Sequence, residues 1–227
     1  MFLFEPRYRP LPPPLMGKRV RLRPPLPGDF AGWSDLRRQS RAFLEPWEPT
    51  WGEEALSRAV YRARQRRMVR EWNADLGYAF HLLATERSDV GARPGLVLGG
   101  INLNQVRRLS AQSASLGYWM GAPYAGLGLM REALELLLPY AFAGAGAGEV
   151  CDPAIGLGLH RIDAACIPEN QRSRRLLTGL GFREIGLAPR YLKINGDWRD
   201  HVCHQMLADD FAARRGGASF RQYLADA

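Results

Sequence analysis

A segment with two glycines, between an expected strand and an expected helix, is the part of the sequence best suited to bind a ligand. Residues 125–131 read Ala-Gly-Leu-Gly-Leu-Met-Arg. Gly126 and Gly128 carry no side chain, so the backbone there can approach a ligand closely. The first amides of the following helix have no partners within the helix, and the helix dipole adds partial positive charge. The segment is therefore suited to a phosphate group, and a pyrophosphate would fit well.

Two common phosphate-binding motifs do not match this segment. A P-loop requires a lysine followed by serine or threonine, whereas Leu129 and Met130 follow Gly128. A dinucleotide-binding fingerprint requires a third glycine and a later acidic residue, and neither is present. If the glycines are considered alone, a tight strand-to-helix turn that binds no ligand is the alternative.

The elements around this segment predict a mixed α/β sheet of the α+β type, with an antiparallel front half. Alternating or apolar runs predict strands at 18–23, 78–85, 96–102, 115–120, 160–166, 182–186 and 201–207. Apolar residues at helical spacing predict helices near 30–36, at 53–73, 127–142 and 170–180, and one more in the tail. Asn195-Gly196 predicts a hairpin turn. We expect residues 43–49, with two prolines, to be irregular.

The chain of 227 residues is 46% hydrophobic, which is sufficient for one domain with additions. We expect a Pro-rich arm at 1–16, a folded domain at 17–208 with a flexible Gly/Ala-rich insertion at 143–158, and a tail at 209–227. No apolar run is long enough to cross a membrane, and the first residues lack the order of a secretory signal. These features predict a cytoplasmic protein that does not bind a membrane.

The formal net charge of +8 suits an anionic partner such as nucleic acid, a ribosome or a phosphorylated cofactor. Arginines are concentrated in the helix expected at 53–73, which presents either a solvated face or a contact surface for acidic protein or RNA. They lack an interleaved aromatic platform, which argues against a protein that only binds RNA. Cys151, Cys166 and Cys203 have no CxxC spacing, so we expect neither a disulfide framework nor a metal site.

A series of segments resembles, in order, landmarks of the GNAT superfamily of N-acetyltransferases, in particular its RimJ/RimL branch and most closely RimJ-like proteins. The segments are Arg21-Leu-Arg23, Phe43-Leu-Glu-Pro-Trp-Glu-Pro49, Ser115-Leu-Gly-Tyr-Trp119, Leu159-His-Arg-Ile162, Pro168-Glu-Asn170 with Ser173, Gly181-Phe182, Tyr191-Leu-Lys-Ile-Asn-Gly196 and Trp198-Arg-Asp-His201. The resemblance covers nearly all of residues 19–207. In the glycine segment, Ala125 and Met130 depart from the family pattern Gln/Arg-x-x-Gly-x-Gly/Ala, in which Gly128 is the central glycine.

The resemblance implies a GNAT fold, in which a mostly antiparallel sheet of about seven strands has helices on both faces. It also implies transfer of an acetyl group from acetyl-CoA to the N-terminal α-amine of a ribosomal protein or a similar protein. The pyrophosphate would be held by the loop and first helical turn: Gly126, Leu127, Gly128, Leu129, Met130 and Arg131. Backbone groups of Tyr118, Trp119 and Met120 would pair with the pantetheine arm. Asn170 and Ser173 would contact CoA, and Ser173 would protonate the departing thiolate.

The group that removes a proton from the amine is not defined by the resemblance. Relatives often have acidic residues where this chain has Ile185 and Arg190. The remaining candidates for the base are Glu48, His201 and Asp200, each of which also has a structural interpretation.

We expect four residues to line the acceptor groove: Trp47, Glu48, Tyr191 and Trp198. Glu48 would attract a cationic N-terminus. In the structural alternative, the two tryptophans are core anchors, Asn170 is only a helix N-cap and Ser173 only bonds backbone.

Two other functions are compatible with the sequence. One is a small-molecule acetyltransferase on the same fold, acting on an amino sugar, polyamine or antibiotic. The other is a CoA-binding, ribosome-associated factor with little catalysis, which the missing acidic residues at 185 and 190 leave open. Both a monomer and a homodimer fit the sequence.

Overall fold

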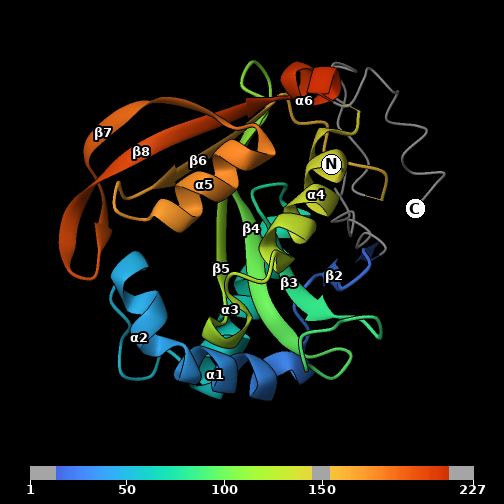
Figure 1. Cartoon of the computed structure of the whole chain (residues 1–227), viewed down its shortest axis with the longest axis vertical. Helices are drawn as coiled ribbons and strands as arrows, with labels where there is room; N and C mark the ends of the chain where they lie inside the picture. Colours follow the sequence, from blue (N-terminus) through green and yellow to red (C-terminus); the bar gives the residue numbers. More distant parts are fainter. Residues whose placement is uncertain (1–13, 145–153, 215–227) are drawn as a thin grey trace, which may run out of the picture.

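The computed structural model describes residues 14–144 and 154–214. Its centre is an eight-stranded sheet in the order β1-β2-β3-β4-β5-β6-β8-β7 (Figure 1). The strands are β1 Leu15–Met16, β2 Val20–Arg23, β3 Tyr78–Ala84, β4 Val97–Arg107, β5 Ser113–Met120, β6 Arg161–Cys166, β7 Arg183–Ile194 and β8 Asp197–Leu207. Neighbouring strands are antiparallel except β5 and β6, which are parallel.

Helices cover both faces of the sheet, with α4 and α5 on one face and α3 on the other (Figure 1). The α-helices are α1 Phe30–Gln39, α2 Arg41–Leu44, α3 Arg58–Asn73, α4 Leu129–Phe142, α5 Gln171–Leu180 and α6 Ala208–Arg214. Three short 3-10 helices are η1 Pro27–Asp29, η2 Glu45–Trp47 and η3 Ala122–Tyr124. The predicted fold class, a mixed and mostly antiparallel sheet with helices on both faces, is confirmed.

The sheet has one strand more than the expected seven. Leu15 pairs with Leu22 and Met16 with Arg21, so the sheet begins inside the segment predicted to be an irregular arm. The prolines that suggested irregular chain end at Pro14, and the two residues that form the strand follow it. Residues 1–13 of the predicted arm lie outside the described residues.

The core is formed where the apolar side of α4 covers the sheet. Leu129, Leu134 and Leu137 of α4 are fully buried, at the helical spacing that places them on one side. They belong to the same cluster as Phe80 on β3 and Ile162 on β6. Burying one such side chain stabilises the fold by about 2 kcal/mol, so this packing fixes α4 and the loop that precedes it.

Two predictions of local structure are wrong at their boundaries. The helix expected at 53–73 begins at Arg58, because the hydroxyl of Ser57 accepts the amide of Val60 at 3.2 Å and caps the helix there. The segment expected to be irregular at 43–49 contains the end of α2 and the 3-10 helix η2. Pro46 fits within the first turn of η2 because amides at that position need no helical partner.

Both strands of the β7–β8 hairpin run further toward the turn than predicted: β7 continues to Ile194 and β8 begins at Asp197. The predicted turn at Asn195-Gly196 is confirmed, with Gly196 at φ 93° in the left-handed region. β7 is the edge strand and pairs only with β8. Most of its side chains are exposed, so it lacks the alternation of apolar and polar residues by which sequence patterns reveal a strand.

The packed domain extends past the boundary predicted at residue 208. Phe211 of α6 is buried, and its ring centroid lies 5.4 Å from that of Phe142 on α4. Of the predicted insertion at 143–158, residues 145–153 lie outside the described residues. Leu157, which follows them, is fully buried. Within 14–144 and 154–214, no helix has the length and hydropathy needed to cross a membrane.

Candidate active site

The loop before α4 has the geometry expected of an anion site. Gly126 and Gly128 have φ values of 81° and 78°, in the left-handed region that favours glycine. Gly128 is the N-cap of α4, and the first amide of this helix with a backbone acceptor is that of Glu132, which donates to Gly128 at 3.1 Å. The preceding amides of the first turn are therefore available to a ligand, and a pyrophosphate fits them.

β5 and β6 separate next to this loop. They pair only from Ser113 to Leu116 on β5, although β5 continues to Met120 along β4. Beyond Leu116, the edge of β5 that faces β6 has no strand partner in the described residues. An extended chain with amide groups, such as a pantetheine arm, can pair with such an edge as an added strand would.

Two hydroxyls meet beside the separated strands. The Tyr118 hydroxyl on β5 lies 2.7 Å from the Ser173 hydroxyl at the start of α5. Burial raises the pKa of Tyr118 above its usual value, against a smaller opposing effect of this hydrogen bond. Burial likewise raises the pKa of the neighbouring Cys166 thiol, opposed by a hydrogen bond with Ser173. All three groups are therefore protonated at neutral pH and can donate hydrogen bonds.

Asn170 positions Ser173. Its side-chain oxygen accepts the Ser173 amide at 3.0 Å, so Asn170 is the N-cap of α5, as the structural alternative for this residue expected. The amide nitrogen of the Asn170 side chain is left free for other contacts, and the residue also lines a cavity described next. A capping role and a ligand-binding role are compatible here.

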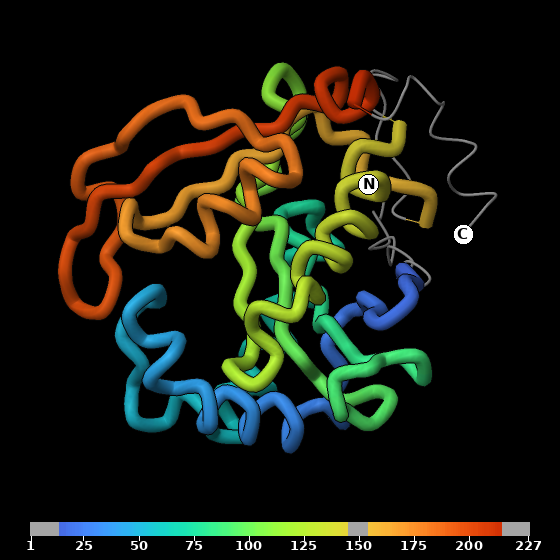
Figure 2. The backbone as a smooth tube through the Cα atoms, in the orientation of Figure 1, coloured from blue at the N-terminus to red at the C-terminus, as the bar shows by residue number. Residues whose placement is uncertain are grey.

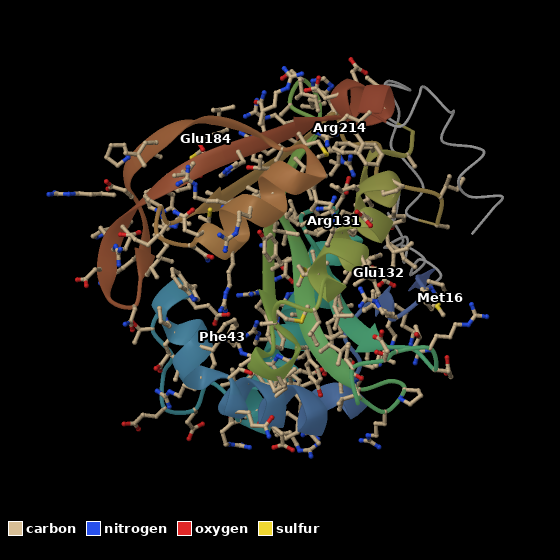
Figure 3. All side chains as sticks on the ribbon, viewed as in Figure 1. Met16, Phe43, Arg131, Glu132, Glu184 and Arg214 are labelled. Carbon is tan, nitrogen blue, oxygen red and sulfur yellow. The ribbon has the colours of Figure 1, made fainter. Side chains whose placement is uncertain are left out.

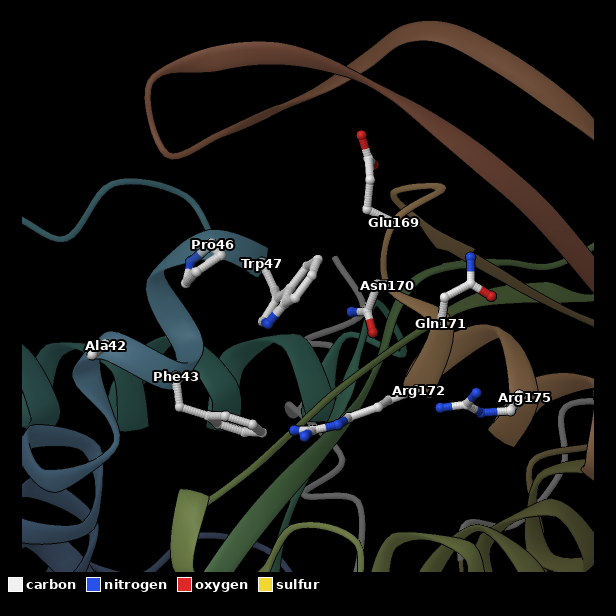
Figure 4. Close-up of a pocket in the computed structure, with 9 residues that line it drawn as sticks. All are labelled: Ala42, Phe43, Pro46, Trp47, Glu169, Asn170, Gln171, Arg172 and Arg175. Carbon is white, nitrogen blue, oxygen red and sulfur yellow. The ribbon is translucent and has the colours of Figure 1, made fainter.

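A cavity of about 420 Å³ lies between the segment of α2 and η2 and the start of α5. These parts are distant in sequence but adjacent in the structure (Figure 2). Phe43 and Trp47 form one wall, and Asn170 and Arg172 lie opposite (Figure 4). The guanidinium of Arg172 lies 5.4 Å from the centroid of the Phe43 ring, so the walls are connected by a cation–π contact. A small amine or the end of a peptide can enter a space of this size.

Glu48 adjoins this cavity but is engaged by Arg37. Both carboxylate oxygens of Glu48 accept from Arg37, at 2.9 and 2.5 Å, and Trp51 donates to one of them at 2.9 Å. The guanidinium of Arg37 lies between two tryptophan rings, 4.2 Å from the centroid of Trp51 and 4.8 Å from that of Trp119. The carboxylate that was expected to face an incoming amine is thus held in an ion pair.

A family comparison decides between the phosphate-binding folds that this geometry allows. The model of the acetyltransferase (GNAT) domain matches residues 19–183, which is more than half of the chain. The chain belongs to the GNAT acetyltransferase family. It is therefore an N-acetyltransferase, and the expected donor of its acetyl group, acetyl-CoA, is confirmed with the family.

One sequence relative and one solved structure show to which branch of the GNAT family this enzyme is similar. It is 32% identical to the [ribosomal protein uS5]-alanine N-acetyltransferase of Escherichia coli over 182 residues, which are 80% of this chain and 84% of that protein. The structure of RimJ from Mycobacterium smegmatis in complex with CoA-disulfide is similar with a TM-score of 0.69 and 28% identity, covering 91% of this chain and 93% of the other. The resemblance to RimJ-like proteins is therefore confirmed.

A third comparison supports the same placement. The ribosomal-protein-S5-alanine acetyltransferase of Vibrio fischeri matches this GNAT enzyme with a TM-score of 0.73 and 25% identity. The match covers 88% of this chain and 98% of that structure. The overall fold is thus shared over most of the chain.

Among the base candidates of this GNAT enzyme, His201 is placed closest to the separated strands. Val202 pairs with Cys166, the last residue of β6, so His201 lies one position beyond the end of β6. Its Nδ1 lies 2.9 Å from the carbonyl oxygen of Arg199, which can only accept, so Nδ1 carries a proton and, in the neutral imidazole, Nε2 is the acceptor. Asp200 is instead exposed and accepts the amide of Arg190 at 2.8 Å.

The hairpin residues expected to line the acceptor groove lie near the base candidates but outside the cavity. The Tyr191 ring packs against that of His201, with centroids 5.7 Å apart. Trp198 is 62% exposed, which excludes the alternative that it is a core anchor. The tip of the hairpin reaches η2, because the amide of Asn195 donates to the carbonyl of Glu48 at 2.9 Å. Ile185 is also exposed on β7.

Near the loop before α4, Arg131 was predicted from the sequence as a site residue, whereas Arg19 was not. Arg19 donates to the carbonyl of Leu127 at 3.1 Å and to the side chain of Glu132 at 2.9 Å, and so joins the loop to α4. Arg131 donates from its side chain to the carbonyl of Gly179 at 3.1 Å and connects α4 with α5 (Figure 3). Arg19 does not stand in a recognisable motif, so no local signal marked it.

Proposed function

We propose that this enzyme acetylates the N-terminal α-amine of a ribosomal protein, with acetyl-CoA as donor. The observation that carries the proposal is the gap between β5 and β6, with the Ser173 hydroxyl beside it and the open amides of α4 at its end. The relatives named above as ribosomal-protein acetyltransferases support the choice of acceptor. An acceptor on the ribosome also implies a cytoplasmic location.

The cofactor residues divide into two groups. The amides of residues 126–131 hold the pyrophosphate, with Arg19 keeping the loop in place through Leu127. The free edge of β5 at Tyr118, Trp119 and Met120 pairs with the pantetheine arm. The bound cofactor supplies an acetyl group activated as a thioester. Together these contacts place its reactive end beside Ser173.

The transfer requires one proton to be delivered and one to be removed. Ser173 delivers a proton to the departing thiolate, because its hydroxyl stays protonated at neutral pH and thiolates are basic. Tyr118 stays protonated and donates the 2.7 Å hydrogen bond to the Ser173 oxygen, which stabilises that oxygen as it loses its proton. Solvent then returns the proton to Ser173, so Ser173 contacts the thiolate and Tyr118 supports Ser173.

His201 removes the proton from the amine. Its Nε2 is an available acceptor, whereas both oxygens of Glu48 are bound by Arg37. Amines attack only in their neutral form, so a base within reach of the acceptor raises the rate. Glu48 instead has a positioning role on the acceptor side. Its backbone carbonyl binds the tip of the β7–β8 hairpin, and its side chain binds Arg37.

The acceptor peptide enters through the cavity between η2 and α5. Trp47 offers an apolar surface there, and the hairpin side chains Tyr191 and Trp198 extend the surface outward. We expect an acceptor whose first residue has a small side chain. The relatives named above act on alanine, which agrees with this expectation.

Acetyl transfer from acetyl-CoA to a panel of amines tests the proposal directly. The panel would contain ribosomal-protein N-terminal peptides that start with alanine, the same peptides with a blocked N-terminus, a polyamine and an amino sugar. We expect turnover of the free peptides only. Turnover of the polyamine or amino sugar alone would show a small-molecule enzyme. Tight CoA binding without any turnover would show a CoA-binding factor instead.

A further inference from the structure

The outward face of α3 carries a row of arginines that the acetyl-transfer site does not use. This helix of 16 residues contains six arginines and a single acidic residue, Glu71. Five of the arginines are exposed, and four of these follow one another at intervals of four residues: Arg58, Arg62, Arg66 and Arg70. Residues four apart lie on the same side of a helix, about 6 Å apart along its axis. We call these four residues the arginine row.

The arginine row is not neutralised within the described part of the chain. Glu71 forms its ion pair with Arg67, at 3.4 Å, and not with a member of the row. Arg58 lies over the ring of Phe30, 4.4 Å from its centroid. No ion pair in residues 14–144 and 154–214 involves Arg62, Arg66 or Arg70. Like charges four residues apart destabilise a helix, so the row works against the stability of α3.

The side of α3 opposite the arginine row packs against the rest of the domain. Tyr61 and Trp72 are buried there, and Ser57 caps the first turn. Arg64 belongs to this inner side, where its guanidinium lies 5.5 Å from the centroid of the Trp33 ring. Figure 1 shows α3 on the face of the sheet opposite α4 and α5. A partner on the arginine row would therefore not cover the cofactor loop before α4.

We propose that the arginine row binds the phosphate backbone of double-stranded RNA. A straight row of guanidinium groups at regular intervals complements a backbone with regularly spaced negative charges. The exposed side of the helix between the arginines carries Ala59, Ala63 and Val69 and no aromatic residue on which a base of a single strand could stack. The Phe30 ring at one end of the row already has the Arg58 guanidinium over it. Duplex RNA is recognised largely through its shape and backbone, which such a surface can provide.

The proposal rests on the proposed function only for the source of the RNA, since a ribosomal-protein acceptor lies among ribosomal RNA. The contact itself does not require acetyl transfer. It would bring the enzyme to its acceptor and orient the acceptor side toward it. The RNA would be bound without sequence preference, because phosphate contacts carry no sequence information.

Binding of the full chain to a labelled RNA duplex, followed by fluorescence anisotropy over a range of salt concentrations, tests the inference. We compare the wild type with R62Q/R66Q, in which glutamine keeps a good helix former on the surface. Removing two phosphate contacts, each worth about 0.9, would make the plot of log K against log salt less steep by about 1.8 and weaken binding at every salt concentration. The matched control R87Q/R93Q removes the same charge from the exposed loop between β3 and β4 and should leave both values unchanged.

Three further measurements separate the outcomes. Acetylation of a free N-terminal peptide should be equal in the wild type and R62Q/R66Q, so loss of the proposed function and loss of RNA binding can be distinguished. Equal weakening by R62Q/R66Q and R87Q/R93Q would overturn the proposal, since only overall charge would matter. So would tighter binding of a polyglutamate peptide than of the duplex, which would identify an acidic protein as the partner, or tighter binding of a single strand of the same sequence.

Discussion

The hydroxyl groups of Tyr118 and Ser173 lie 2.7 Å apart, although 55 residues separate them in the sequence. The contact joins β5 to the start of α5 at the point where β5 and β6 separate. It places two protonated donors beside the strand edge at which the cofactor is proposed to pair. The arrangement leads to distinct expectations for the two residues.

Replacement of Ser173 by alanine should lower kcat by about 100-fold or more, because a general acid contributes about 10²- to 10⁴-fold. Tyr118→Phe should lower kcat by about tenfold, since Ser173 keeps its own proton. The Kd for CoA should change little in both. Steady-state kinetics with an N-terminal peptide and calorimetric titration with CoA provide these values. A kcat for Ser173→Ala within threefold of wild type would exclude the serine as the acid.

His201→Gln should lower kcat by about 100-fold, because the amine would lose its proton acceptor. Glu48→Gln is the matched comparison, and its kcat should stay within about fivefold of wild type while KM for the peptide rises. The reason is that Glu48 already binds Arg37 with both oxygens and acts through the position of the hairpin. If Glu48→Gln lost about 100-fold in kcat and His201→Gln stayed near wild type, Glu48 and not His201 would be identified as the base.

Gly128→Ala should weaken CoA binding by about tenfold and also lower stability. A side chain at φ 78° costs about 1–2 kcal/mol, and the new Cβ would lie 3.4 Å from Nη2 of Arg19. Gly126→Ala carries the same backbone cost in open space. Gly28→Ala is the control, because it has no such strain and no neighbour within 4 Å. Calorimetry would contradict the assigned loop if all three variants bound CoA equally.

The free energy of unfolding should fall at acid pH because Asp29 becomes protonated. Burial alone would raise the pKa of Asp29, but hydrogen bonds from Arg23 and His81 outweigh it and hold that pKa well below its usual range. A depressed carboxyl pKa adds stability above the unfolded value near 4, and this contribution is lost as the pH falls toward the folded value.

Asp29→Asn should therefore lower the free energy of unfolding by about 2–3 kcal/mol at pH 7, and the difference should shrink below pH 4. Urea denaturation at several pH values measures it. Asp35→Asn is the control, because Asp35 forms an exposed pair with Arg38 and should change stability little. A pH-independent difference between wild type and Asp29→Asn would show that packing, and not charge, is responsible.

Much of the fold was predictable because its signals are local. The apolar spacing in 127–142 predicted α4, the dipeptide Asn195-Gly196 predicted the hairpin turn, and Gly126 and Gly128 predicted the loop. The errors also have local causes. Pro46 was taken to exclude a helix although it fits the first turn of η2, and the start of α3 was placed before its cap at Ser57.

The acceptor side was less predictable because its contacts are set by partners that no pattern identifies. Arg37 is one arginine among many in the chain, yet only the fold places it between Trp51 and Trp119 and against Glu48. The site residues expected from the family resemblance are consistent with the geometry, and their roles stay predictions until the variants above are measured.

The sequence by itself determined the family, the glycine loop before α4 and most elements, because glycines, caps and apolar periodicity act over a few residues. The tertiary structure decided how the candidates for proton transfer differ. It joined Tyr118 to Ser173, bound the carboxylate of Glu48 to Arg37, and left Nε2 of His201 as an acceptor at the end of β6. Such contacts depend on which strands pair and where two of them separate, and that is set by the packing of the whole sheet.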